Sequence, residues 1–220
     1  MFSITSLEIA GHNGRPVANQ LYRGGGESDW LALVLPGMGY TAAMPLLYYP
    51  TFLLLGLGAE VLQVSYDFDR DPAYQRASAQ ERRRWLAEEV NAAYTAGMAQ
   101  RTYRRLTLVG KSIGTLAMAD LLPQTPADST RCVWLTPLLP SPELRAAIRQ
   151  HPRPSLFAIG TADPGYDAGL LDEVRRAAGG EALVFEGTDH SLMLGGDIEG
   201  ALAIMGRLIA ALRAFLAPPA

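Results

Sequence analysis

The chain has 220 residues, of which 49% are hydrophobic and 19% charged, and its net charge is −3. A chain of this length can bury a large core without dividing, so we expect one domain over residues 1–220. The absence of a basic excess argues against nucleic acid as a partner. The chain has a single cysteine, Cys132, which excludes an internal disulfide and suits a reducing compartment. We expect its side chain to be buried in the protein core.

The N-terminal residues have neither the basic start nor the long apolar stretch of a secretory signal, which favours a cytoplasmic location. The most apolar stretch, residues 46–57, contains Pro50 and falls short of the roughly 20 residues that a membrane span requires. We therefore predict a buried helix in this stretch and no membrane span.

Two early segments, residues 3–10 and 17–22, roughly alternate apolar with polar side chains. Between them lies a cluster of turn-forming residues at 11–16, rich in glycine, asparagine and proline. This arrangement predicts an antiparallel hairpin at the N-terminus.

From residue 31 onward the pattern changes to short apolar runs that suit parallel strands covered on both faces. Between the runs lie segments whose apolar residues recur at helical spacing. The clearest of these predicted helices starts at Ser78, which is expected to form a capping box with Glu81. The last helix is expected to end before Pro218 and Pro219. The order predicts an α/β fold: a doubly wound, mostly parallel sheet with helices on both faces. The runs are residues 31–35, 61–64, 106–109, 132–135, 156–159 and 182–185.

The central chemical signal is the segment 110–114, which reads Gly-Lys-Ser-Ile-Gly and joins the strand at 106–109 to a helical stretch. In a nucleophile elbow the serine of Gly-x-Ser-x-Gly sits on a strained strand-to-helix turn, so Ser112 is the candidate nucleophile. The same residues match the end of a phosphate-binding P-loop. That interpretation is disfavoured because Arg105 stands where the first glycine of the loop is required, and because the residues between belong to the predicted apolar strand.

A serine nucleophile needs a general base, and the carboxyl ends of parallel strands are where such a group can reach it. His190 follows the last predicted strand and is the candidate base. His12 lies in the hairpin turn and His151 precedes the strand at 156–159, so we expect both at the surface.

The residue that orients the base should also follow a strand, and Asp163 follows the strand at 156–159. Asp167 lies on the same segment and remains an alternative acid. Asp189 adjoins His190 directly, which makes a hydrogen bond to the Nδ1 atom of that histidine awkward.

An oxyanion needs two backbone donors. Ile113 supplies one, as the residue after the nucleophile, and the glycine-rich loop at 35–40 can supply the other through the Met38 N–H. The alternative interpretation of this loop is a plain strand-to-helix turn.

These segments together resemble the α/β-hydrolase superfamily over residues 31–216, including the chain order serine, aspartate, histidine. The resemblance implies that Ser112 attacks an acyl carbonyl, that His190 accepts its proton, and that Asp163 fixes the imidazole tautomer. It implies no cofactor and no metal. Pro36 replaces the histidine with which the family's oxyanion segment often begins, and Lys111 is an uncommon neighbour of the nucleophile whose role stays open.

The connection at 136–141 leads straight from a strand to a helix, which leaves no room for a cap domain. We therefore predict an open site and a hydrolase of carboxylic esters or thioesters with small to medium acyl groups. A noncatalytic binding module, or an acyltransferase or peptidase with the same triad, are the alternatives. Substrate identity and oligomeric state stay open. The expected lining of the site is Met38, Tyr40, Leu138, Leu139 and Leu192.

Overall fold

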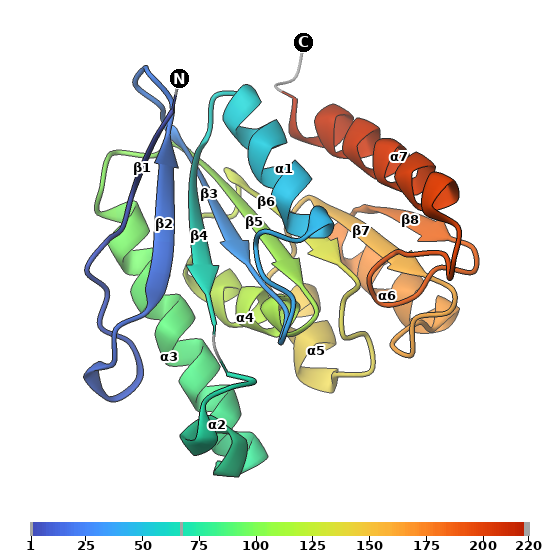
Figure 1. The fold of residues 1–220 in the computed structure, drawn as a ribbon, viewed down its shortest axis with the longest axis horizontal. Helices are drawn as coiled ribbons and strands as arrows, with labels where there is room; N and C mark the ends of the chain where they lie inside the picture. Colours follow the sequence, from blue (N-terminus) through green and yellow to red (C-terminus); the bar gives the residue numbers. More distant parts are fainter. Residues whose placement is uncertain (1, 67, 218–220) are drawn as a thin grey trace.

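The computed structural model describes residues 2–66 and 68–217. Its centre is an eight-stranded sheet with the strand order β1-β2-β4-β3-β5-β6-β7-β8 (Figure 1). The six predicted apolar runs form the parallel strands β3 to β8. The strands are β1 (Ser3–Thr5), β2 (Ala18–Arg23), β3 (Trp30–Leu35), β4 (Glu60–Ser65), β5 (Arg105–Lys111), β6 (Thr130–Leu135), β7 (Ser155–Gly160) and β8 (Glu181–Phe185).

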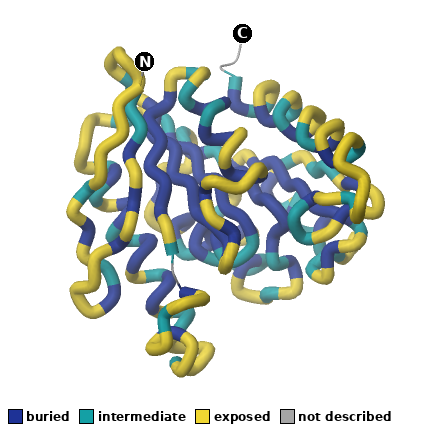
Figure 2. Tube along the Cα trace, in the orientation of Figure 1, coloured by how far each residue is buried: buried dark blue, intermediate teal, exposed yellow. Residues whose placement is uncertain are grey.

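Helices cover both faces of the sheet, as the sequence predicts. Buried side chains of α1 and α7 share one apolar core with the sheet, and those of α3, α4, α5 and α6 share the other. The strands between the two helix layers are buried along most of their length (Figure 2). The α-helices are α1 (Pro45–Gly56), α2 (Pro72–Arg76), α3 (Ala79–Met98), α4 (Ile113–Leu121), α5 (Pro142–Gln150), α6 (Ala168–Ala178) and α7 (Ile198–Leu216).

The predicted helix starts and ends agree with the structure where they can be compared. The Ser78 side chain accepts the Glu81 N–H, and the Glu81 side chain accepts the Ser78 N–H, so the capping box is confirmed. The apolar stretch at 46–57 forms α1, and within the described residues no helix is long and apolar enough to cross a membrane. Pro218 and Pro219 lie outside the described residues.

The N-terminal hairpin is confirmed, but its first strand is shorter than predicted. β1 pairs with β2 in antiparallel register only from Ser3 to Thr5. Beyond it the Asn19 side chain accepts the Leu7 N–H at 2.9 Å and donates to the Leu7 carbonyl at 2.8 Å. A side chain thus satisfies backbone groups that a continued strand ladder would have paired.

The prediction that His12 lies at the surface is wrong. Its ring is buried at 7% exposure, stacks on Trp85 of α3 at 4.4 Å between ring centroids, and places Nδ1 2.6 Å from Glu88. The turn at 11–16 folds back over α3, a tertiary contact that local sequence does not reveal. His151 is half-buried at the end of α5.

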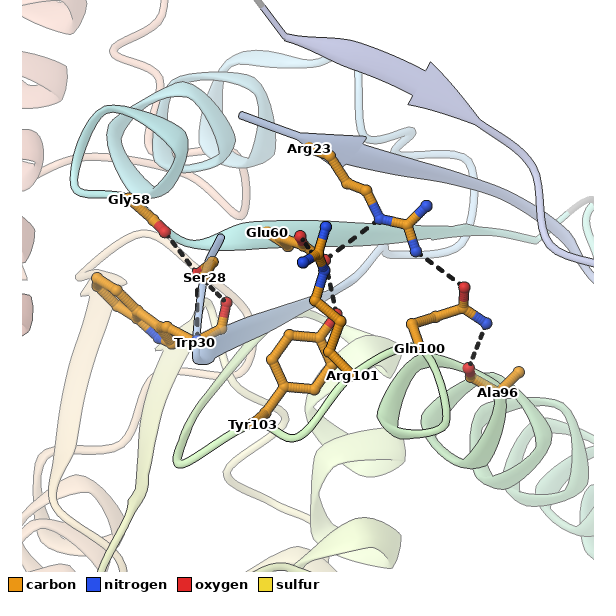
Figure 3. A network of polar contacts seen from close by, with 9 residues as sticks. All are labelled: Arg23, Ser28, Trp30, Gly58, Glu60, Ala96, Gln100, Arg101 and Tyr103. Carbon is orange, nitrogen blue, oxygen red and sulfur yellow. Dashed lines mark hydrogen bonds and ion pairs between the residues drawn. The ribbon is translucent and has the colours of Figure 1, made fainter. Parts of the chain in front are cut away.

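A buried carboxylate ties together the sheet edge where the parallel strands begin. Glu60, only 1% exposed, accepts a hydrogen bond from the Tyr103 hydroxyl at 2.6 Å and pairs with Arg101 at 2.9 Å and with Arg23 at 3.4 Å (Figure 3). The two cations compensate the burial of the carboxylate, and burial raises the pKa of Tyr103. This network lies at the edge of the sheet where β4 begins, opposite to the carboxyl ends of the parallel strands.

The strand order reverses between β3 and β5. The chain runs from β3 to its neighbour β4 and then crosses back to β5 on the other side of β3. In open parallel sheets this reversal opens a crevice at the carboxyl ends of the strands, where ligands bind. The residues after β3, β5, β6, β7 and β8 therefore meet at one edge.

Candidate active site

Ser112 sits on a strained turn between β5 and α4. Its backbone angles are φ 56° and ψ −118°, a conformation that a non-glycine residue rarely adopts. The flanking glycines make the turn possible: a Cβ atom on Gly114 would lie 2.2 Å from the Leu35 carbonyl oxygen, and one on Gly110 would lie 2.5 Å from the Met118 sulfur. The strand-turn-helix context predicted for the Gly-x-Ser-x-Gly segment is present.

Thr115 secures this turn and was not predicted. Its N–H and its hydroxyl both donate to the Ser112 carbonyl, at 2.9 and 2.6 Å. The hydroxyl also accepts the Leu138 N–H at 3.4 Å, which links the turn to the loop after β6. A threonine three residues after the serine gives no distinctive sequence signal, because threonine is ordinary in a first helical turn.

The structure pairs His190 with Asp163. The Nδ1 atom of His190 lies 2.7 Å from Oδ2 of Asp163, and the other oxygen of the carboxylate accepts the Gly165 N–H at 2.8 Å. Asp163 is buried at 4% exposure, whereas His190 is half-buried. Because a carboxylate only accepts, Nδ1 carries the ring proton and Nε2 keeps a lone pair with which it can accept one.

The two other candidate acids have structural partners instead. Asp167 caps α6 by accepting the Leu170 N–H at 2.9 Å. Asp189 accepts the N–H groups of Ser191 and Met193 at 2.7 and 3.0 Å, which shapes the turn that follows His190. Neither carboxylate forms a hydrogen bond with His190.

A tight contact keeps the loops after β7 and β8 together. A Cβ atom on Gly160 would lie 2.0 Å from the Thr188 carbonyl oxygen, which accepts the Ala162 N–H at 3.0 Å. These two loops carry Asp163 and His190, so the distance between the two side chains depends on this glycine. The sequence contains Gly160 at the end of a predicted strand, but nothing local indicates how closely the second loop approaches.

The loop after β3 makes a four-residue turn beside Ser112. The Tyr40 N–H donates to the Gly37 carbonyl at 3.3 Å, and Gly39 has a φ of +66°. A Cβ atom on Gly37 would lie 3.2 Å from that of Ser112. Among the described residues, neither the Met38 nor the Ile113 N–H donates a hydrogen bond, so both are available as donors.

Comparisons with known proteins agree with this arrangement at the level of the fold. No protein-family model matches the sequence, and no curated protein matches it significantly. Solved structures do match over nearly the whole chain. An esterase from Pyrococcus furiosus, Pf2001, superposes with a TM-score of 0.73 at 14% identity, covering 98% of this chain and 92% of the other.

A lidless α/β serine hydrolase from Xanthomonas campestris, XC6422, superposes with a TM-score of 0.71 at 16% identity, covering 98% of this chain and 97% of the other. The chain has the α/β-hydrolase fold. Est1E from Butyrivibrio proteoclasticus, solved with ferulic acid bound, matches with a TM-score of 0.73 at 12% identity over 96% of this chain and 98% of its own.

The residues predicted to line the site differ in how far they are exposed. Met38 is 45% exposed and Leu138 is half-buried. Leu139 and Leu192 are 0% and 1% exposed and belong to the two apolar cores, so they cannot touch a substrate without loop movement. Tyr40 lines a cavity of about 200 Å³ between the loops after β3 and β4. Met44, Tyr66 and Asp69, also on its wall, were not predicted.

Two further titratable groups have shifted pKa values. Burial raises the pKa of the Cys132 thiol to about 12, which keeps it protonated and unreactive. Burial lowers the pKa of Lys111 to about 8, against the opposing effect of the Asp163 and Asp189 carboxylates. Within the described residues, no three side chains of histidine, cysteine, aspartate or glutamate gather as metal ligands.

Proposed function

We propose that the chain is a serine hydrolase that cleaves carboxylic esters or thioesters of small to medium acyl groups through an acyl-enzyme intermediate. The observation that carries this proposal is the 2.7 Å pair between Asp163 and the Nδ1 atom of His190. It lies at the same sheet edge as the strained Ser112 turn, on the α/β-hydrolase fold. A fold alone does not establish activity, so the proposal rests on this combination.

In the proposed reaction the Ser112 hydroxyl attacks the acyl carbonyl while Nε2 of His190 takes its proton. Asp163 stabilises the imidazolium that forms, without itself becoming protonated. The N–H groups of Met38 and Ile113 donate to the oxyanion of the tetrahedral intermediate. The imidazolium then gives its proton to the departing alcohol or thiol, leaving the acyl group on Ser112.

Water completes the cycle by the same route. His190 takes a proton from the water as it attacks the acyl-enzyme, and returns that proton to Ser112 when the carboxylic acid leaves. The mechanism needs no cofactor and no metal, because the side chains supply the base and the backbone supplies the oxyanion donors.

The proposed substrate size follows from the surroundings of Ser112. The short connection at 136–141 leads from β6 directly into α5, which leaves the site without a cap. A cavity of about 200 Å³ is lined by Gly37 and Tyr40 of the oxyanion turn, although not by Ser112 itself, and its volume suits a small or medium group. The buried Cys132 suits a reducing compartment, so we propose that the enzyme works in the cytoplasm, as a single domain.

The proposal is tested by stopped-flow hydrolysis of a p-nitrophenyl ester series from acetate to laurate. An ester of ferulic acid belongs in the panel because one structural neighbour was solved with that acid bound. We expect turnover of the shorter esters and, where deacylation is slow, a burst of nitrophenol equal to the enzyme concentration. Ser112→Ala should lower kcat by more than about 10³-fold while retaining the wild-type melting temperature.

Absence of turnover on every ester, in a protein with a cooperative melting transition, would contradict the hydrolase proposal and favour a binding module. Turnover that persists in Ser112→Ala would assign the nucleophile elsewhere.

A further inference from the structure

Lys111, the residue before the candidate nucleophile, is buried beside the loop after β3. It is the last residue of β5 and is only 3% exposed. Because side chains alternate along a strand, it points to the same face as Val109, which lies in the core beneath α1 and α7. Its stem passes under the oxyanion turn: a Cβ atom on Gly37 would lie 3.0 Å from its Cδ atom.

The Lys111 ammonium rests on an aromatic ring. Its Nζ atom lies 4.5 Å from the centroid of the Tyr40 ring. It forms no ion pair and donates no hydrogen bond to any residue that the structure describes. A charge buried without such partners is costly, since the ring face replaces only part of its hydration. Costs of this kind are typical of functional sites, and this one lies next to the candidate nucleophile.

The ring that receives this charge belongs to the oxyanion turn. Tyr40 closes the turn by donating its N–H to the Gly37 carbonyl, and its hydroxyl accepts the Leu46 N–H of α1 at 3.0 Å. The ring is therefore fixed at its hydroxyl by α1 and on its face by Lys111. The Met38 N–H lies between Gly37 and Tyr40 in the same turn.

We propose that Lys111 is a positioning residue: its charge, held against the Tyr40 ring, fixes the turn that presents the Met38 N–H to the oxyanion. The inference rests on the proposed hydrolase function and deepens it. Lys111 acts through Tyr40 and does not touch the substrate. A loosened turn weakens a hydrogen bond that matters most in the transition state, so loss of the charge lowers kcat more than it raises KM.

The charge is present only over part of the pH range. With a pKa of about 8, Lys111 is charged at neutral pH and loses its proton above that value. The titratable groups that face it are Tyr40 on the oxyanion turn, Asp163 after β7 and Asp189 after β8. Burial raises the pKa of Tyr40, which keeps its hydroxyl neutral through this range. The contact with the ring therefore weakens as Lys111 deprotonates.

The test compares Lys111→Met with Arg105→Met on one p-nitrophenyl ester that the wild type turns over. Arg105 is a matched control because it begins the same strand and lies 3.8 Å from the Trp30 ring, but at the opposite edge of the sheet. We expect Lys111→Met to lower kcat about tenfold with little change in KM, and Arg105→Met to leave both unchanged.

Two further measurements separate positioning from bulk stability. The kcat of the wild type should fall as pH rises through about 8, and Lys111→Met should lack this fall because it has no proton to lose. Tyr40→Leu removes this contact and also the hydroxyl that accepts the Leu46 N–H, so it should lower kcat at least as much as Lys111→Met does. The double variant should be no worse than Tyr40→Leu alone, because the contact is already lost in that variant.

A wild type that turns over ester while Lys111→Met matches its kcat and its pH profile would overturn the positioning role and leave the proposed function standing. Additive losses in the double variant would equally overturn a role exerted through Tyr40. A folded wild type without turnover on any ester would instead contradict the proposed function, and this role with it.

Discussion

At the scale of single residues, the two oxygens of the Asp163 carboxylate have separate partners. One accepts the Nδ1–H of His190 and the other accepts the Gly165 N–H, so the carboxylate cannot turn without losing a hydrogen bond. The imidazole is thereby held in one tautomer, with Nε2 directed away from the acid.

Asp163→Asn should lower kcat on the order of 10³-fold or more, because an amide that donates to Nδ1 forces the proton onto Nε2 and removes the base. Asp167→Asn is the matched control, since asparagine caps a helix as well as aspartate does. Steady-state kinetics on one ester compares them. A greater loss from Asp167→Asn would reverse the assignment of the acid.

Lys111 also gives a prediction about stability. Its pKa falls from 10.5 to about 8 on folding, so between these values the unfolded chain binds more protons and stability rises with pH. Below about pH 8 the lysine is charged in both the folded and the unfolded state. The folded state then bears the full cost of burying this charge, about 3 kcal/mol. Lys111→Met should therefore be more stable than the wild type near neutral pH.

This advantage should shrink as pH rises from about 8 toward 10.5, and only above 10.5 is the wild-type lysine neutral in both states. Urea unfolding at about pH 7 and about pH 10 measures it. A stability difference that is the same at both pH values would show that the buried ammonium has no depressed pKa.

At the scale of elements, the elbow depends on how closely α4 approaches β3. The contact between Gly114 and the Leu35 carbonyl leaves no space for a side chain. Gly114→Ala should therefore lower the free energy of unfolding by about 3 kcal/mol or abolish folding, because backbone must move on both sides. The measurement is urea denaturation followed by circular dichroism.

Gly206→Ala is the control for this substitution. Gly206 is an exposed residue of α7, and a Cβ atom there would meet no heavy atom within 4 Å. This variant should gain about 0.5–1 kcal/mol, since alanine favours the helix over glycine. If both substitutions changed the free energy of unfolding equally, close packing of α4 against β3 would not explain the effect of Gly114→Ala.

Elements and site differ in how far the sequence predicts them. The apolar runs identify all six parallel strands because a strand buried on both faces needs uninterrupted apolar residues. The length of β1 was predicted wrongly because the Asn19 side chain forms the hydrogen bonds that the Leu7 backbone would form in a longer strand. The burial of His12 was not predicted because it results from packing against Trp85 of α3. Both errors arise from contacts between segments distant in sequence.

At the scale of the whole molecule, two apolar cores flank one sheet, and the candidate chemistry is confined to one edge of it. Strand order explains why the positions of Ser112, Asp163 and His190 at this edge were predictable, since each follows a parallel strand. The supports of the site were not predictable. Thr115, Gly160 and the contact between Lys111 and Tyr40 depend on how neighbouring loops pack.

The central claim is that the fold activates Ser112 as a nucleophile, and covalent labelling tests it most directly. The purified protein would be treated with a fluorophosphonate probe, digested and analysed by mass spectrometry, with Ser112→Ala and Asp167→Asn beside it. We predict one adduct, on Ser112, in the wild type and in Asp167→Asn, and none in Ser112→Ala. A folded wild type that stays unlabelled, or that carries its adduct on another serine, would contradict the account.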